Sequence, residues 1–283
     1  MGRPILVGID GSIASRAATT WAIEHARRTQ AQVALLLVVD DEWGTFSGRD
    51  LGELRRSAET TVDRELAFAE ESSDGTPVTA SLSVGNPMLT LATVAREFEL
   101  VVIGTHKAGS FHGHALGSRS LQLAAMSPVP TAVVPVSASR GRSGVAVGVG
   151  TAPGWLEPIE FAMREATRLG EPLLLFRSDR GDRADATTDE EVMRLVGELP
   201  GITEVAGGVS LRRSTSPSGE ALAAASRRAV LTVTGRPTER GARGYRPLGR
   251  TNSDLLMNTG GPVIVVPQLV DYRWEEPTRT LQV

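Results

Sequence analysis

Residues 4–12 read PILVGIDGS, and this short stretch decides how the chain folds. Its apolar part, residues 5–9, has no polar alternation, which is typical of a strand buried on both faces. Ser12 follows at a position suited to capping a helix, and residues 13–29 place alanines and Trp21 at helical spacing. The stretch therefore predicts a buried strand that passes directly into a helix.

The alternation of strand and helix continues through the first half of the chain. Helices are predicted at 51–71, 88–98 and 118–126, and further strands at 33–39, 78–84, 100–103 and 131–136. Apolar strands separated by helices form a parallel sheet covered on both faces. The predicted fold class is a doubly wound five-stranded α/β domain, and such sheets bind ligands at the carboxyl ends of their strands.

The second half repeats the first at an offset of about 140 residues, which falls to about 132 near the end. The run ending at Val7-Gly8-Ile9 matches Val147-Gly148-Val149, and residues 131–135 match 263–267. Trp21 matches Phe161, and we interpret both as core residues rather than ligand contacts. Two copies of this length predict tandem domains. We assign them to residues 1–137 and 143–268, with a small and polar linker between them and a tail at 269–283.

The composition excludes several classes of protein. The chain of 283 residues carries 30 basic and 33 acidic residues, a net charge of −3. This net charge gives no general electrostatic attraction to nucleic acid or to an anionic membrane. It has no cysteine, which excludes disulfides and thiolate chemistry, and Lys107 is its only lysine, which excludes a Walker A motif. No apolar run approaches membrane-spanning length, no secretory signal is recognisable, and we expect a cytoplasmic protein.

Two loops at predicted strand ends carry the chemistry. The first, Gly8-Ile9-Asp10-Gly11-Ser12, offers a carboxylate suited to a ribose or a base amine, although Asp10 is equally suited to capping the following helix. The second runs from Gly104 to Ser120 and is rich in glycine, so its backbone amides can approach an anion closely. It enters a helix at Ser118, where unpaired amides favour phosphate. A plain surface loop with a capping serine is the alternative.

These motifs, in this order, resemble the universal stress protein family. The likeness rests on G-I-D-G-S, L-L-V-V-D, V-G-N-P, V-V-I-G-T, the glycine-rich loop, L-G-S and a terminal V-V-P-V; it is strong over residues 1–137 and faint over 143–268. The family's ATP-binding branch carries G-x2-G-x9-G-[ST] in this loop. Gly104, Gly117 and Ser118 match that pattern, and Lys107 replaces its middle glycine.

The resemblance implies a Rossmann-like fold related to adenine nucleotide alpha hydrolases, and a role as an ATP-binding module in stress adaptation. The implied ligand is ATP or a related adenine nucleotide, with an accompanying Mg²⁺ left open. Asp10 and Val39 would flank the adenine, Gly104 and Thr105 the ribose, and Gly117, Ser118, Arg119 and Ser120 the phosphates. The full candidate set is Gly8, Ile9, Asp10, Val39, Gly104, Thr105, Lys107, Gly109, Gly117, Ser118, Arg119 and Ser120.

The second domain has lost most of these features. Gly150 stands where Asp10 stands in the first, and Arg250 takes the place of the loop serine. Five arginines in the later loop offer either an anion site or a solvated face: Arg236, Arg240, Arg243, Arg246 and Arg250. We expect residues 131–136 and 263–266 to pair, making an internal pseudo-dimer, and a homodimer is a further option.

Three functions remain open after this reading. The favoured one is a binding module without catalytic residues; a weak nucleotide hydrolase and a structural or partner-binding stress protein are the alternatives. His106, His112 and His114 cluster in the glycine-rich loop, but that loop holds no acidic residue and we assign no metal site.

Overall fold

The computed structural model describes residues 2–40, 48–105, 118–137, 141–150, 154–179, 187–239 and 248–270. Its strands are β1 (Ile5–Ile9), β2 (Val33–Val39), β3 (Val78–Val84), β4 (Leu100–Thr105), β5 (Thr131–Pro135), β6 (Val145–Gly148), β7 (Leu173–Ser178), β8 (Val209–Ser214), β9 (Leu231–Glu239) and β10 (Val263–Val270). Its helices are α1 (Ile13–Thr29), α2 (Gly48–Ser72), α3 (Pro87–Val94), α4 (Ser118–Met126), α5 (Leu156–Leu169), α6 (Asp189–Gly197), α7 (Ser218–Ser226) and α8 (Arg250–Asn258). Short 3₁₀ turns follow at η1 (Ala95–Glu97) and η2 (Ile202–Glu204).

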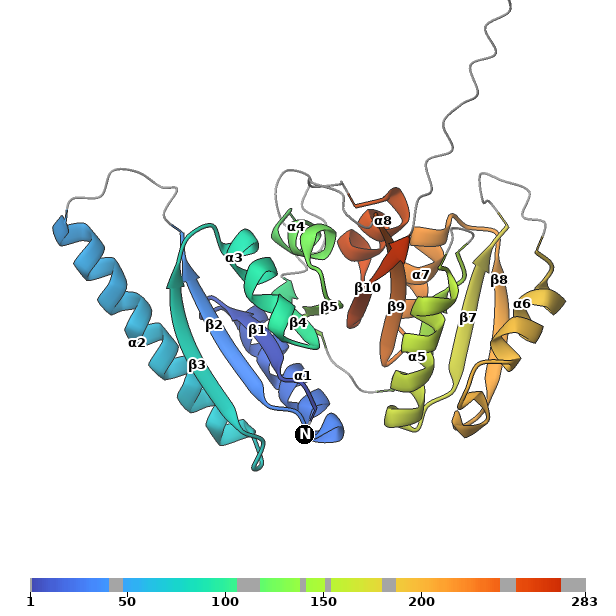
Figure 1. The fold of residues 1–283 in the computed structure, drawn as a ribbon, viewed down its shortest axis with the longest axis horizontal. Coiled ribbons are helices and arrows are strands. Elements are labelled where there is room, and N and C mark those ends of the chain that lie inside the picture. Colours follow the sequence, from blue (N-terminus) through green and yellow to red (C-terminus); the bar gives the residue numbers. More distant parts are fainter. Residues whose placement is uncertain are drawn as a thin grey trace, which may run out of the picture.

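All ten strands join in one sheet, in the order β3-β2-β1-β4-β5-β10-β9-β6-β7-β8 (Figure 1). Within each half the five strands are parallel and follow the same order, as the sequence predicts. In both halves the chain reverses direction across the sheet between the first and fourth strands, β1 and β4 or β6 and β9. Such switch points open a crevice beyond the strand ends.

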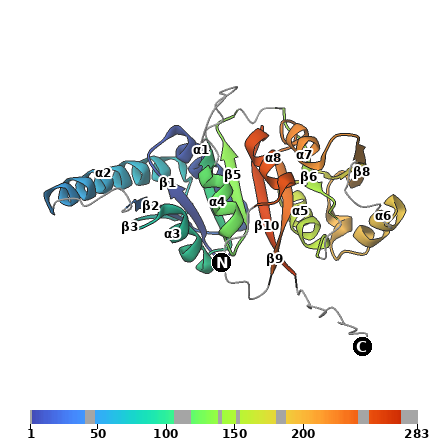
Figure 2. The ribbon, with the colours of Figure 1, turned by 90° about the horizontal axis from the view of Figure 1, so that it is seen from above.

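The two halves meet at the middle of the sheet. Strand β10 runs antiparallel to β5, with Val263 opposite Val133 and Val265 opposite Thr131 (Figure 2). These are the two strands that the sequence analysis expects to pair. Each of these strands would otherwise expose an apolar edge, and their pairing covers both edges. The outer strands of the joined sheet are β3 and β8.

Each face of the sheet carries its own core. Helices α1, α2, α5 and α6 contribute to one core, and Trp21 and Phe161 pack against it partly buried, in keeping with their interpretation as core residues. Helices α3, α4, α7 and α8 contribute to the other core. Strands β1, β4, β5 and β6 are almost wholly buried between the two, which is why their sequences show no polar alternation.

Local signals in the sequence explain most helix boundaries. Ser12 caps α1 by accepting a hydrogen bond from the amide of Ser15, and Asn86 caps α3 in the same way, with Pro87 in its first turn. The helix expected at 88–98 is shorter, because α3 ends at Val94 and continues as a 3₁₀ turn. No helix among the described residues is long and apolar enough to cross a membrane.

Side chains also join the two halves across their boundary. Arg236 on β9 is buried and donates from Nη2 to the carbonyl of Ser127, 2.7 Å away in the first half. On the other face, His25 of α1 lies with Nδ1 3.5 Å from a carboxylate oxygen of Glu165 on α5. Both of these side chains are buried, and Trp21 stacks on the His25 ring. The halves are therefore tied by polar contacts as well as by the sheet.

Candidate functional site

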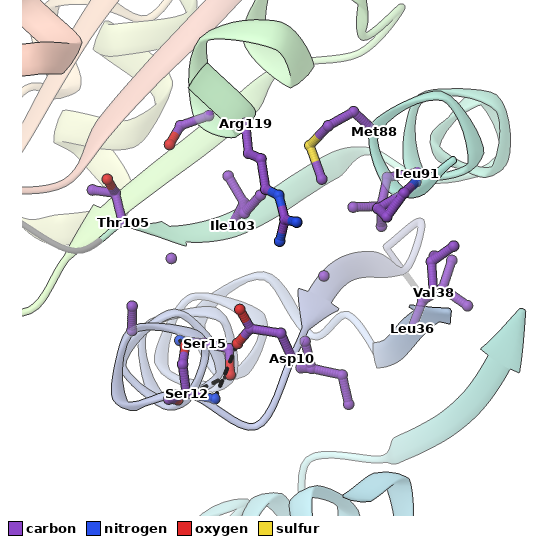
Figure 3. Close-up of a pocket in the computed structure, with 16 residues that line it drawn as sticks. Asp10, Ser12, Ser15, Leu36, Val38, Met88, Leu91, Ile103, Thr105 and Arg119 are labelled. Carbon is purple, nitrogen blue, oxygen red and sulfur yellow. Dashed lines mark hydrogen bonds between the residues drawn. The ribbon is translucent and has the colours of Figure 1, made fainter. Parts of the chain in front are cut away.

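A cavity of about 520 Å³ opens at the switch point of the first half (Figure 3). The ends of β1, β2 and β4 contribute to it, together with the first turns of α1, α3 and α4. One wall is apolar and the other carries hydroxyl, carboxylate and guanidinium groups. Its lining residues are Gly8, Ile9, Asp10, Ser12, Ala14, Ser15, Leu36, Val38, Pro87, Met88, Leu91, Ile103, Gly104, Thr105, Arg119 and Ser120.

Asp10 lies where β1 turns into α1. Its Oδ1 accepts a hydrogen bond from the amide of Ser12 at 3.0 Å, and its side chain is exposed to the cavity. The helix cap itself is Ser12, so Asp10 stabilises the turn in front of the helix rather than capping it. Asp10 is therefore not the helix cap: one of its oxygens fixes the loop, and its carboxylate lines the cavity.

The turn that carries Asp10 is held from behind by α2. Gly11 has φ +76°, and a Cβ there would lie 2.8 Å from Nη2 of Arg64, so the turn requires glycine. Glu65, almost fully buried, accepts hydrogen bonds at 3.0 Å from both Nε and Nη2 of Arg16 on α1. This bidentate pair joins α1 to α2 beneath the loop and keeps the carboxylate of Asp10 in place.

Helix α4 begins at Ser118 and directs its first turn at the same cavity. Ser120 is buried and Arg119 exposed, and Figure 3 shows Arg119 extending into the cavity from the side opposite Asp10. The unpaired amides at the start of α4, together with Arg119, make this end of the cavity favourable for an anion. The expected contributions of Lys107, Gly109 and Gly117, and the side chain of Ser118, lie outside the described residues.

The sequence analysis missed the apolar wall. Pro87, Met88 and Leu91 of α3 line the cavity together with Leu36 and Val38 of β2. The motif V-G-N-P marks the start of α3, and it was the one available signal for this wall. Helix packing brings α3 over the strand ends, and nothing local in the sequence shows that.

The resemblance implies that Val39 flanks the adenine, but its side chain does not line the cavity. Strand residues alternate between faces, so Val38 points to the cavity while Val39 packs against the core on the α1 and α2 side. The Val39 carbonyl accepts a hydrogen bond from the amide of Gly85 at 2.9 Å. The adjacent residue, Val38, is therefore the one in position to touch a ligand.

The corresponding elements of the second half carry different side chains, and several of these bond to neighbouring residues. Asn252 on α8, the counterpart of Ser120, donates to the carbonyl of Gly235 at 2.9 Å and accepts from Thr234 at 2.7 Å. Gln268 is buried and donates to the carbonyl of Gly154 at 2.7 Å. Gly219 replaces Met88, and a Cβ there would lie 2.7 Å from Cβ of Asp254, so α7 and α8 pack closely. The described residues of the second half thus differ from the first at the counterparts of Ser120 and Met88.

Two of the five arginines of the later loop, Arg236 and Arg250, are described by the structure, and these two do not form an anion site together. Arg236 is buried with its guanidinium on Ser127, and Arg250 is exposed beside Asp254, with Nε 3.5 Å from a carboxylate oxygen. Arg240, Arg243 and Arg246 lie outside the described residues, as do His106, His112 and His114. Within the described part of the chain, no group of three or more acidic or histidine side chains is placed to hold a metal ion.

The family model for the universal stress protein family matches residues 1–135. Residues 1–135 therefore form a universal stress protein domain. A universal stress protein of Mycobacterium tuberculosis strain H37Rv is 32% identical over 131 residues, which are 46% of this chain and 44% of that relative. One from Mycobacterium bovis is 30% identical over 201 residues, 62% of this chain and 63% of its own length. The chain thus matches roughly half the length of these relatives.

The likeness to a solved structure extends over both halves. A universal stress protein from Archaeoglobus fulgidus aligns with 94% of this chain and 99% of its own, with a TM-score of 0.75 and 18% sequence identity. At that identity the likeness concerns the fold. The tandem arrangement of two universal-stress-like halves is therefore found in another protein of the family.

Proposed function

We propose that the first half is a binding module for an adenine nucleotide, with ATP as its ligand, and that the protein serves in stress adaptation. The observation that carries the proposal is the cavity at the switch point of β1 and β4, with an apolar wall facing a polar one. Its volume of about 520 Å³ lies within the range of small-molecule sites. A nucleotide needs both walls, because its base is flat and apolar while its phosphates are charged.

The residues present suit each part of such a ligand. Asp10 would accept hydrogen bonds from the nucleoside, and the base would lie against the wall formed by Val38, Met88 and Leu91. Gly104 and Thr105 would adjoin the ribose. The phosphates would meet the first turn of α4 through Arg119 and Ser120, together with Gly117 and Ser118 of the preceding loop.

The remaining candidates belong to the same proposal. Gly8 and Ile9 lie in the floor of the cavity, and Lys107 and Gly109 belong to the loop that leads into α4. A Mg²⁺ ion would accompany the phosphates rather than be held by the chain, because Asp10 is the one carboxylate among the described lining residues and Mg²⁺ sites usually combine carboxylate with phosphate oxygens.

Calorimetric titration with ATP tests this function. We expect one nucleotide per chain, because the second half has Gly150 in place of Asp10 and Arg250 in place of Ser118. Asp10→Ala should weaken binding by about tenfold, the low end for a lost hydrogen bond to a charged group. Asp63→Ala, which removes an exposed carboxylate from α2, is the matched control and should leave binding unchanged. No binding, or two equal sites, would contradict the proposal.

A further inference from the structure

The second half has a groove on the face of the sheet covered by α7. Its volume is about 440 Å³, and it lies between α7 and the strands β7 and β8. Leu174 and Phe176 contribute apolar side chains to its lining, with three alanines of α7. It is separate from the cavity of the proposed nucleotide site, with which it shares no lining residue.

The two halves can be compared residue by residue at this place. A Cβ on Gly8 would meet Leu91 at 2.9 Å, and a Cβ on Gly148 would meet Leu222 at the same distance, so these leucines correspond. The same offset holds at the next strand, because Leu100 pairs with Ile5 as Leu231 pairs with Val145. Every residue from 91 to 100 therefore has a defined counterpart 131 positions later.

On the strand side of the groove, Leu174 and Phe176 replace the smaller Ala34 and Leu36. On the helix side, the correspondence places smaller side chains along the groove. Val94 and Phe98 pack against the core in the first half, and their counterparts are Ala225 and Ala229. Thr93 is likewise replaced by Ala224. Side chains on the buried face of a sheet normally pack without gaps, because an empty apolar volume loses van der Waals contacts. Truncation at three neighbouring positions leaves room for a ligand.

The charge of the groove changes together with its volume. Arg228 is the counterpart of Glu97, and Arg212 is the counterpart of Ser81, since each pairs with the matching residue of the neighbouring strand. Arg227 lies beside them. All three arginines line the groove and are exposed, and none of them has an ion-pair partner within the described part of the chain. Glu220 is the acidic residue in the lining.

Arg213 contributes less to this charge, because it is already engaged. Its Nε lies 2.9 Å from a carboxylate oxygen of Asp189, and its Nη1 lies 3.5 Å from one of Asp179. This pairing attaches β8 to the start of α6. The positive charge available to a ligand therefore comes from Arg212, Arg227 and Arg228.

We propose that this groove binds a small organic anion with an apolar body, such as an aromatic or aliphatic carboxylate. The apolar lining buries the body of the ligand, and the arginines at the rim bind its anionic group. The site is independent of the proposed nucleotide site. Guanidinium groups suit carboxylate and phosphate monoester groups alike, because both present paired oxygens.

The probe for this site is 2-naphthoate, titrated into the full chain by calorimetry in the presence of ATP. Its neutral analogue 2-naphthalenemethanol has nearly the same shape, and inorganic phosphate supplies charge without an apolar body. We expect naphthoate to bind at least tenfold more tightly than either. Equal binding of the neutral analogue would overturn the role of the arginines, and equal binding of phosphate would overturn the role of the apolar lining. Tighter binding of a hexaglutamate peptide would overturn the choice of a small molecule.

Two variants locate the site. Arg212→Gln combined with Arg227→Gln leaves the fold intact, since both side chains are exposed, and should weaken naphthoate about tenfold. Ala225→Val combined with Ala229→Phe restores the residues of the first half and should abolish binding. Arg56→Gln on α2 is the control and should have no effect. Unchanged affinity in the double arginine variant would overturn the proposal even if the second variant failed to fold.

Discussion

Arg119 illustrates how one side chain can discriminate among ligands at the candidate site. It projects into the cavity from α4, opposite Asp10, at the end where the proposed phosphates would lie (Figure 3). Arg119→Gln should therefore weaken ATP by about fivefold and leave adenosine unchanged, because an exposed charge contributes only about 1 kcal/mol. The loss should shrink at high salt. Titrations of both ligands decide this, with Arg56→Gln as control, and equal weakening of adenosine would disprove it.

The residues of the site also show what a sequence reveals. Asp10 and Thr105 were predictable because each follows a buried apolar strand, and strand ends are where doubly wound sheets bind ligands. Met88 and Leu91 were not, since their place on the cavity wall depends on how α3 packs over β2. The side chain of Val38 lines the cavity while that of Val39 packs on the other face, and only the pleat of the strand tells the two apart.

Helices α7 and α8 are packed more tightly than their counterparts, and Gly219 allows this. An alanine in a helix is ordinarily more stable than glycine by about 0.5–1 kcal/mol. At Gly219 the added Cβ would lie 2.7 Å from Cβ of Asp254 and 2.8 Å from the carbonyl oxygen of Thr251. Gly219→Ala should therefore lower the free energy of unfolding by about 1–3 kcal/mol.

The control for this prediction is Gly197, at the end of α6. A Cβ there meets no atom within 4 Å, so Gly197→Ala should be neutral or slightly stabilising. Urea denaturation of both variants gives the two free energies of unfolding. If the two substitutions had the same effect, the close packing of α7 on α8 would lose its support.

Helices α1 and α5 meet through a buried pair whose ionisation depends on pH. Burial lowers the pKa of His25 to about 4, with the nearby charges of Arg168 and Arg28 acting in the same direction. Burial also raises the pKa of Glu165, although Arg168, with Nη1 2.7 Å away, opposes that shift. The pKa of Glu99 is raised as well, by burial first and by the charge of Glu165 among the lesser causes. His25 is therefore neutral in the folded protein at neutral pH.

A His25→Phe variant isolates the histidine contribution to stability. As the pH falls from 6.5 towards 4, His25 takes up a proton in the unfolded chain and not in the folded one, so the folded state loses stability across this window. A shift of this size corresponds to roughly 2 kcal/mol by pH 4.5. Phenylalanine keeps a ring beside Trp21 and removes this loss. Unfolding free energies measured from pH 7.5 to 4.5 should fall more steeply for the wild type, and parallel curves would refute the assignment.

At the scale of the whole molecule, the two halves share one sheet but differ in the residues that line the cavity of the first and the groove of the second. The duplication and the five parallel strands of each half followed from the spacing of apolar runs, because those runs record burial directly. What the sequence did not reveal is how the second half diverged. Asn252, the counterpart of Ser120, is engaged with Thr234 and Gly235, and a groove lies where Ala225 and Ala229 replace larger residues. Both changes depend on contacts between elements far apart in the chain.

The joined sheet predicts that the halves stay together without a covalent link. The contact combines the antiparallel pairing of β5 with β10, the buried bond from Arg236 to Ser127, and the packing of α1 on α5 around His25. A protease site inserted at residues 138–140 and then cut should leave a single species near 30.0 kDa on gel filtration. Separation would require exposing the buried edges of β5 and β10 to water. Arg236→Met should weaken the association of the cut protein, because it removes a hydrogen bond across the boundary. Halves that elute separately at about half the mass, each folded by circular dichroism, would mean that the linker rather than the sheet holds them together.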